Sequence, residues 1–107
     1  MSFSISSDVD AQKVATITLA GELDSLSSRE FQSAIEHVAA ENPKELVLRV
    51  EDLSFMSSAG LRVLIFSKQK MGTNLPIFMV KPQSAIVDTL EKTGLQHSVN
   101  IVDEYPA

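Results

Sequence analysis

Apolar and polar residues alternate in two stretches near the start of the chain. Every second residue is apolar from Phe3 to Ile5 and again from Ala15 to Leu19, with serine or threonine between them. A period of two is typical of a strand that buries one face. Asp10 and its neighbours are suited to a turn between the two runs, so the sequence predicts a β-hairpin.

The spacing of apolar residues changes after this hairpin. From Phe31 onward they recur at intervals of three and four, which indicates an amphipathic helix. Ser27 and Glu30 fit a capping box at its start, and Leu26 and Phe31 fit a hydrophobic staple. We expect Pro43, together with the asparagine before it, to end the helix.

The rest of the chain continues as alternating strands and helices. Leu46–Val50 is a short apolar run of the kind found in a strand covered on both faces. The remaining elements are expected in this order: residues 51–60 opening a second helix, residues 71–74 ending it, a strand at 76–80, a third helix closed by Gly94, and a last strand at about 99–102.

This order of elements defines the expected fold class. Two strands followed by three helix–strand units predict an α/β domain with one mixed sheet of four or five strands and about three crossover helices. The length of 107 residues suits one domain that covers residues 1–107, and no repeat or linker divides the chain.

Composition narrows the classes of function. The formal net charge is −5 and the few basic residues are scattered, which argues against binding to nucleic acid or to an anionic membrane. The absence of cysteine excludes disulfides and zinc–thiolate sites. No signal peptide or membrane-length apolar run is present, so we expect a cytoplasmic protein.

The most informative polar segment is the turn from Ser57 through Ser58 and Ala59 to Gly60. It follows an apolar strand and opens a helix, where the helix dipole favours added negative charge. The alternative is that Ser57 or Ser58 only caps the helix. Asp24 follows the second strand and would share the same sheet edge, either as a contact for a partner or as an acceptor for nearby backbone.

Other candidate residues give no support for an enzyme. Glu51 and Asp52 are adjacent rather than paired across a site, and His37 and His97 fit structural or surface positions. No nucleophile elbow, phosphate-binding loop or zinc-protease motif occurs. We therefore expect no catalytic residues, no metal ligands and no cofactor.

The second helix offers a possible apolar contact. Its buried stripe is expected at Leu61, Leu64, Ile65 and Met71. Arg62, Val63 and Phe66 would then face the flank and the opposite side. Phe66 is either an exposed anchor for a protein partner, with Arg62 and Lys70 around it, or is covered by a neighbouring helix.

The segment from Asp52 to Leu61 resembles the signature of STAS domains, especially bacterial anti-sigma factor antagonists, and Gly21–Asp24 resembles a second landmark of that family. The resemblance implies an α/β sheet, no catalytic activity and a serine that a partner kinase phosphorylates. By motif position this serine is Ser58. Many members have aspartate directly before it, where this chain has Ser57, which is the other candidate.

The resemblance also implies partners. In the family, the unphosphorylated antagonist binds an anti-sigma factor that is also a serine kinase with a histidine-kinase-like ATP fold, and so releases a sigma factor. A metal-dependent serine phosphatase restores the antagonist. The implied contact residues are Asp24, Met56, Ser57, Ser58, Ala59, Gly60, Arg62 and Phe66. The alternative within the family is a constitutive accessory subunit, for example of a lipid-transport ATPase.

One departure from the family pattern concerns the end of the chain. Many members have a further amphipathic helix, but the residues after Glu104 are too few to form one. We therefore expect this helix to be short or absent. The sheet edge or face that it would cover is then available for a partner or a dimer.

Overall fold

The computed structural model describes residues 3–72 and 74–105. The strands are β1 (Ser4–Val9), β2 (Val14–Leu23), β3 (Glu45–Met56), β4 (Ile77–Val80) and β5 (Asn100–Val102). The helices are α1 (Ser27–Ala39), α2 (Ser58–Met71), α3 (Ser84–Thr93) and the short 3₁₀ helix η1 (Leu95–His97). The predicted order of strands and α-helices is confirmed. The stop expected at residues 71–74 agrees with the end of α2 at Met71, although residue 73 lies outside the described residues.

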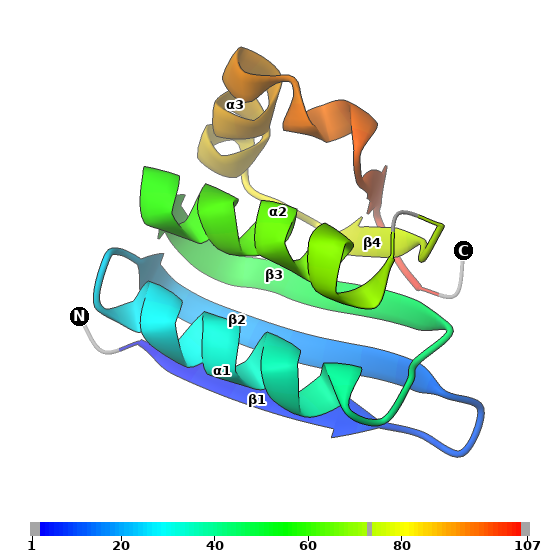
Figure 1. Cartoon of the computed structure of the whole chain (residues 1–107). Helices are drawn as coiled ribbons and strands as arrows, with labels where there is room; N and C mark the ends of the chain where they lie inside the picture. Colours follow the sequence, from blue (N-terminus) through cyan, green and yellow to red (C-terminus); the bar gives the residue numbers. More distant parts are fainter. Residues whose placement is uncertain (1–2, 73, 106–107) are drawn as a thin grey trace.

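All five strands form one sheet in the order β1-β2-β3-β4-β5 (Figure 1). β1 and β2 form the predicted antiparallel hairpin, and the other neighbours are parallel. Each parallel pair is joined through a helix, as parallel strands require. The mixed sheet with crossover helices is therefore confirmed, with five strands in the described residues.

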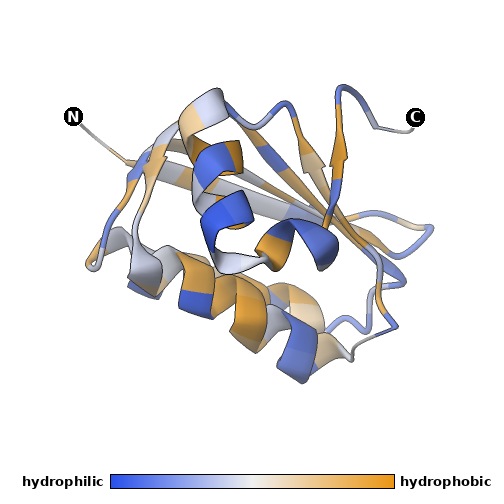
Figure 2. Ribbon diagram, turned by 90° about the horizontal axis from the view of Figure 1, so that it is seen from above, coloured by the Kyte–Doolittle hydropathy of each residue, from blue (hydrophilic) through white to orange (hydrophobic). Residues whose placement is uncertain are grey.

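Helices α1 and α2 lie side by side on one face of the sheet (Figures 1 and 2). Alternate residues of the central strands point into this layer, and Ile17 and Leu48 are fully buried there. Ile86 and Leu90 of α3 belong to the same core. A single apolar core thus fixes the strand ends on which the candidate site is built.

The opposite face of the sheet, here called the open face, carries Val47 of β3 and its parallel neighbour Phe78 of β4. The residues after β5 turn back onto this face, where the rings of Tyr105 and Phe78 lie 5.0 Å apart between centroids. The Tyr105 hydroxyl donates a hydrogen bond to the Glu45 carboxylate, and Val47 is completely buried. No helix follows β5 as far as Tyr105, and residues 106–107, on which the expectation of a short or absent helix also falls, lie outside the described residues. Tyr105 thus covers part of the open face.

Strand β3 is longer than predicted. The expectation of a strand at 46–50 with the helical region opening from residue 51 is wrong, because β3 continues to Met56. Pairing with β2 holds the extension in place as far as the Leu23–Met56 pair. Two register shifts, at Thr18/Ala20 and at Gly21/Glu22 of β2, absorb the extra residues of β3.

The buried face of α2 also differs from the prediction. Val63 is only 4% exposed, whereas Ile65 is 44% exposed. The reason is that α2 packs against α1 as well as the sheet, so its buried stripe is turned toward α1. Phe66 is half-buried and packs against the core beside α1, which supports the alternative of a covering neighbour while leaving part of the ring accessible.

Candidate functional site

The ends of β2 and β3 meet at one edge of the sheet. Leu23 and Met56 are paired in the parallel ladder, and the Ser57 N–H donates to the Leu23 carbonyl at 2.8 Å. Asp24 follows Leu23 directly and begins the turn into α1, and Ser58 follows Ser57 as the first residue of α2. The structure therefore brings Asp24 and Ser58 to the same edge, as the sequence predicted.

The turn from β2 into α1 is closed by reciprocal hydrogen bonds. Oδ1 of Asp24 accepts from the N–H groups of Leu26 (3.0 Å) and Ser27 (2.9 Å). The Ser27 hydroxyl accepts from the Asp24 N–H at 2.8 Å and reaches the Glu22 carbonyl at 2.8 Å. The Asp24 carboxylate thus accepts from N–H groups at the start of α1, and the Ser27 hydroxyl bonds back to the Asp24 N–H, as in a capping box.

This arrangement corrects two predictions about the start of α1. The capping box at Ser27 and Glu30 is wrong, because the Ser27 hydroxyl is engaged with the preceding turn and the box begins three residues earlier, at Asp24. The staple between Leu26 and Phe31 is also wrong, since Leu26 is 72% exposed while Phe31 is fully buried. The alternative that Asp24 bonds nearby backbone is confirmed.

The same hydrogen bonds set the charge of Asp24. The backbone N–H of Ser27, followed by its hydroxyl, lowers the pKa of the Asp24 carboxyl below its ordinary value of 3.8. Hydrogen bonds to a carboxylate favour its charged form. Asp24 is therefore an exposed, fully ionised carboxylate at neutral pH, beside the turn that carries the two serines.

The turn from β3 into α2 separates the roles of Ser57 and Ser58. Ser57 is the N-cap, with extended backbone (φ −81°, ψ 172°), and its hydroxyl accepts from the Gly60 N–H at 3.4 Å. Ser58 is the first helical residue and is exposed. Among the described residues its hydroxyl makes no hydrogen bond. The capping alternative therefore applies to Ser57, and the Ser58 hydroxyl does not cap the helix.

Gly60 lets the start of α2 lie directly on the strand ends. A Cβ atom at Gly60 would come within 2.7 Å of Leu23 Cδ2 and 3.0 Å of Met56 Cγ. Met56 itself is only 4% exposed. Of the expected contact residues, Met56 and Gly60 are thus buried and shape the surface from beneath. Asp24, Ser58 and Arg62 are exposed, and Ser57, Ala59 and Phe66 are half-buried.

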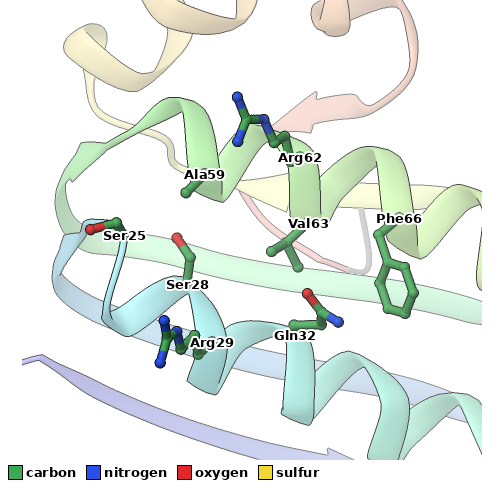
Figure 3. A pocket seen from close by; sticks show the side chains of 8 residues that line it. All are labelled: Ser25, Ser28, Arg29, Gln32, Ala59, Arg62, Val63 and Phe66. Carbon is green, nitrogen blue, oxygen red and sulfur yellow. The ribbon is translucent and has the colours of Figure 1, made fainter.

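An open groove of about 330 Å³ runs between α1 and α2 next to these turns (Figure 3). It is lined by Ser25, Ser28, Arg29, Gln32, Ala59, Arg62, Val63 and Phe66. Its lining residues include two arginines and no carboxylate, in a chain whose net charge is −5. The groove is therefore a basic patch on an acidic protein.

The residues that α1 contributes to the groove were not predicted from the sequence. Ser25, Ser28, Arg29 and Gln32 follow helical spacing on one side of α1 and its leading turn. A polar helix side of this kind has the pattern of an ordinary solvent-exposed face. Only the neighbouring position of α2 turns it into the wall of a groove.

Within residues 3–72 and 74–105, no three histidine, aspartate or glutamate side chains come close enough together to hold a metal ion. No helix in this part of the chain has both the length and the apolar character needed to cross a membrane.

The sequence signature and the fold agree with comparisons to known proteins. Residues 7–106 match the STAS domain family, so the chain belongs to this family. A protein relative, the anti-sigma-F factor antagonist RsfB of Mycobacterium tuberculosis, is 27% identical over 92 residues, which cover 86% of this chain and 75% of RsfB.

Solved structures show the same fold. An anti-sigma factor antagonist from Mycobacterium paratuberculosis superposes with a TM-score of 0.85 at 24% identity, covering 97% of this chain and 88% of that chain. The Bacillus cell fate determinant SpoIIAA in its phosphorylated form gives a TM-score of 0.71 at 17% identity, covering 92% of this chain and 90% of the other. These similarities confirm the predicted α/β architecture.

Proposed function

We propose that this STAS domain is an anti-sigma factor antagonist whose binding is controlled by phosphorylation of Ser58. Unphosphorylated, it binds an anti-sigma factor that is also a serine kinase, and so frees the sigma factor. A metal-dependent serine phosphatase reverses the modification. The observation that carries the proposal is the exposed Ser58 hydroxyl, which makes no hydrogen bond within residues 3–72 and 74–105 and lies at the edge that it shares with Asp24. The name of the relative RsfB and the phosphorylated state of SpoIIAA support it.

The local structure favours Ser58 over Ser57 as the phosphate acceptor. The Ser57 hydroxyl accepts a backbone hydrogen bond as the helix cap, and a phosphate there would disturb this contact. A phosphate on Ser58 would instead stand at the first position of α2, beside N–H groups that lack intrahelical partners. The helix dipole also favours negative charge at that end.

The same phosphate opposes binding of a partner at this edge. It brings a charge of about −1.5 to −2 to the surface, and that charge must lose water when a partner docks. It also stands near Asp24, which is already ionised because its pKa is lowered. We expect phosphorylation or Ser58→Asp to weaken binding about a hundredfold, which is roughly 2.7 kcal/mol.

Binding measurements test the direction of the switch. The purified anti-sigma factor kinase is titrated calorimetrically with the wild type, Ser58→Asp, Ser58→Ala and Phe66→Ala. Ser58→Ala should bind like the wild type, and Ser58→Asp should bind about a hundredfold more weakly. Phe66→Ala should cost more than about 1 kcal/mol of binding if the ring is a contact. Equal or tighter binding by Ser58→Asp would overturn the proposal.

Phosphopeptide mapping tests the site itself. The wild type, Ser57→Ala and Ser58→Ala are incubated with the same kinase and ATP. Ser57→Ala is the matched control, because it removes the neighbouring hydroxyl and keeps Ser58. We expect phosphate on the wild type and on Ser57→Ala, and none on Ser58→Ala. Phosphate on Ser57 alone would contradict the assignment. If none of the three proteins carried phosphate, the result would favour a constitutive accessory subunit.

A further inference from the structure

We infer that Arg62 binds the phosphate on Ser58 across one turn of α2, so that phosphorylation removes the basic rim of the groove between α1 and α2. This inference rests on the proposed phosphorylation of Ser58 and adds how the same site is regulated. Phosphorylation then has two effects. The phosphate adds negative charge, and it engages a cation, Arg62, that the unphosphorylated surface presents.

Helix geometry places the two residues together. Ser58 is the first residue of α2, the helix is continuous to Met71, and Arg62 follows Ser58 by four positions. Residues spaced in this way lie on the same side of a helix, with Cβ atoms about 5–6 Å apart. Helical side chains lean toward the N-terminus. Figure 3 shows the Arg62 guanidinium directed toward the end of α2 that carries Ala59.

Arg62 is available for this contact. It is exposed, and the ion pairs found among the described residues, Lys81–Glu51 and Lys92–Asp88, do not involve it. Asp24, the carboxylate of the turn into α1, already accepts hydrogen bonds from the start of that helix. A phosphate on Ser58 therefore gains Arg62 without displacing an existing partner. Guanidinium–phosphate contacts are among the stronger hydrogen bonds of proteins because both groups are charged.

The groove would change its charge as a result. Arg29 from α1 and Arg62 from α2 are the charged residues of its lining. Once Arg62 pairs with a dianion, that side of the groove carries a net negative charge and only Arg29 remains as a free cation. A partner carboxylate that meets Arg62 in the unphosphorylated state would then meet a phosphate instead.

The test uses the full chain with phosphoserine incorporated at position 58 during translation, so that no kinase is needed. A ³¹P NMR titration measures the pKa of the phosphate in this protein, in its Arg62→Gln variant and in its Arg29→Gln variant. A nearby cation favours the dianion, so Arg62→Gln should raise the phosphate pKa by about 0.3 or more. Arg29→Gln is the matched control, because it removes an equal charge from the other wall, and should change the pKa by less than about 0.1.

The conservative variant Arg62→Lys checks the geometry. It keeps the charge and loses the planar fork, so its phosphate pKa should fall between those of the parent and Arg62→Gln. An unchanged pKa in Arg62→Gln, or an equal rise in Arg29→Gln, would overturn the inference while leaving phosphorylation of Ser58 intact. Conversely, failure of any kinase to modify Ser58 would remove the proposed function, and the engineered phosphoserine would still report whether the pair forms.

Discussion

Two turns at the same sheet edge solve the same structural problem in different ways. Each leads from a parallel strand into a helix, and each must satisfy the free N–H groups of the first helical turn. In the turn into α1, Asp24 and Ser27 bond each other and close a tight network. In the turn into α2, Ser57 contributes one long hydrogen bond and Ser58 contributes none among the described residues.

The difference shows how the residue proposed for phosphorylation is placed on a fixed backbone. The backbone of the Ser58 turn is fixed from below, where Gly60 packs against Leu23 at the end of the neighbouring strand. The Ser58 hydroxyl is therefore not needed to hold the turn, and Ser58 is exposed. In the Asp24 turn, by contrast, the polar side-chain atoms form hydrogen bonds at the start of α1. Substitutions in the two turns should therefore affect stability very differently.

The largest effect on stability is expected for Ser27→Ala. Ser27 is 5% exposed, and its hydroxyl satisfies the Asp24 N–H and the Glu22 carbonyl. Removing it leaves both groups without this partner, which should cost roughly 1–3 kcal/mol of unfolding free energy in a urea titration. Ser33→Ala is the control, since Ser33 is exposed on the same helix and should change stability by less than about 0.5 kcal/mol. Equal losses for both variants would show that the network contributes little.

A smaller effect should appear in the pH dependence of stability. The hydrogen bonds from Ser27 lower the pKa of Asp24 below 3.8 in the folded state, so its stabilising contribution is complete above that pH. The contribution is lost as the pH falls through the lowered pKa. In thermal melts at decreasing pH, the wild type should therefore lose more stability than Asp24→Asn in acid. Parallel pH profiles for the two proteins would argue against a lowered pKa.

The smallest effects are expected in the other turn. Ser57→Ala removes a long cap contact and should cost about 0.5–1 kcal/mol, at the low end for a helix cap. Ser58→Ala should stay within about 0.5 kcal/mol of the wild type. Ser58→Asp should fold normally, because the helix dipole favours its charge by about 0.3–1 kcal/mol. A larger loss for Ser58→Ala than for Ser57→Ala, measured by urea unfolding, would reverse the assignment of the cap.

The sequence predicted the order of elements because periodicity and turn residues act locally. It failed where a neighbour decides the outcome. Residues 51–56 lack a regular alternation and become a strand only because β2 pairs with them through two register shifts. The cap of α1 was displaced because Asp24 and Ser27 are both good capping residues, and hydrogen bonds within the folded turn choose between them.

In the candidate site, too, features set by local sequence could be predicted, and features set by a neighbouring element could not. The meeting of Asp24 and Ser58 could be predicted, because carboxyl ends of adjacent parallel strands lie at one edge. The burial of Val63 and the exposure of Ile65 on α2 could not be predicted, because they depend on the side from which α1 packs against α2. The same approach creates the groove with Arg29, which no local pattern marks.

The Tyr105 contact on the open face makes the protein its own optical probe. The chain has one tyrosine and no tryptophan, so tyrosine emission comes from Tyr105 alone. Its hydrogen bond to Glu45, together with burial, raises the pKa of the phenol to about 12, so the absorbance of the tyrosinate should emerge only in strong alkali. Tyrosine fluorescence and absorbance therefore report, without any added label, on the packing of Tyr105 against Phe78 and Glu45.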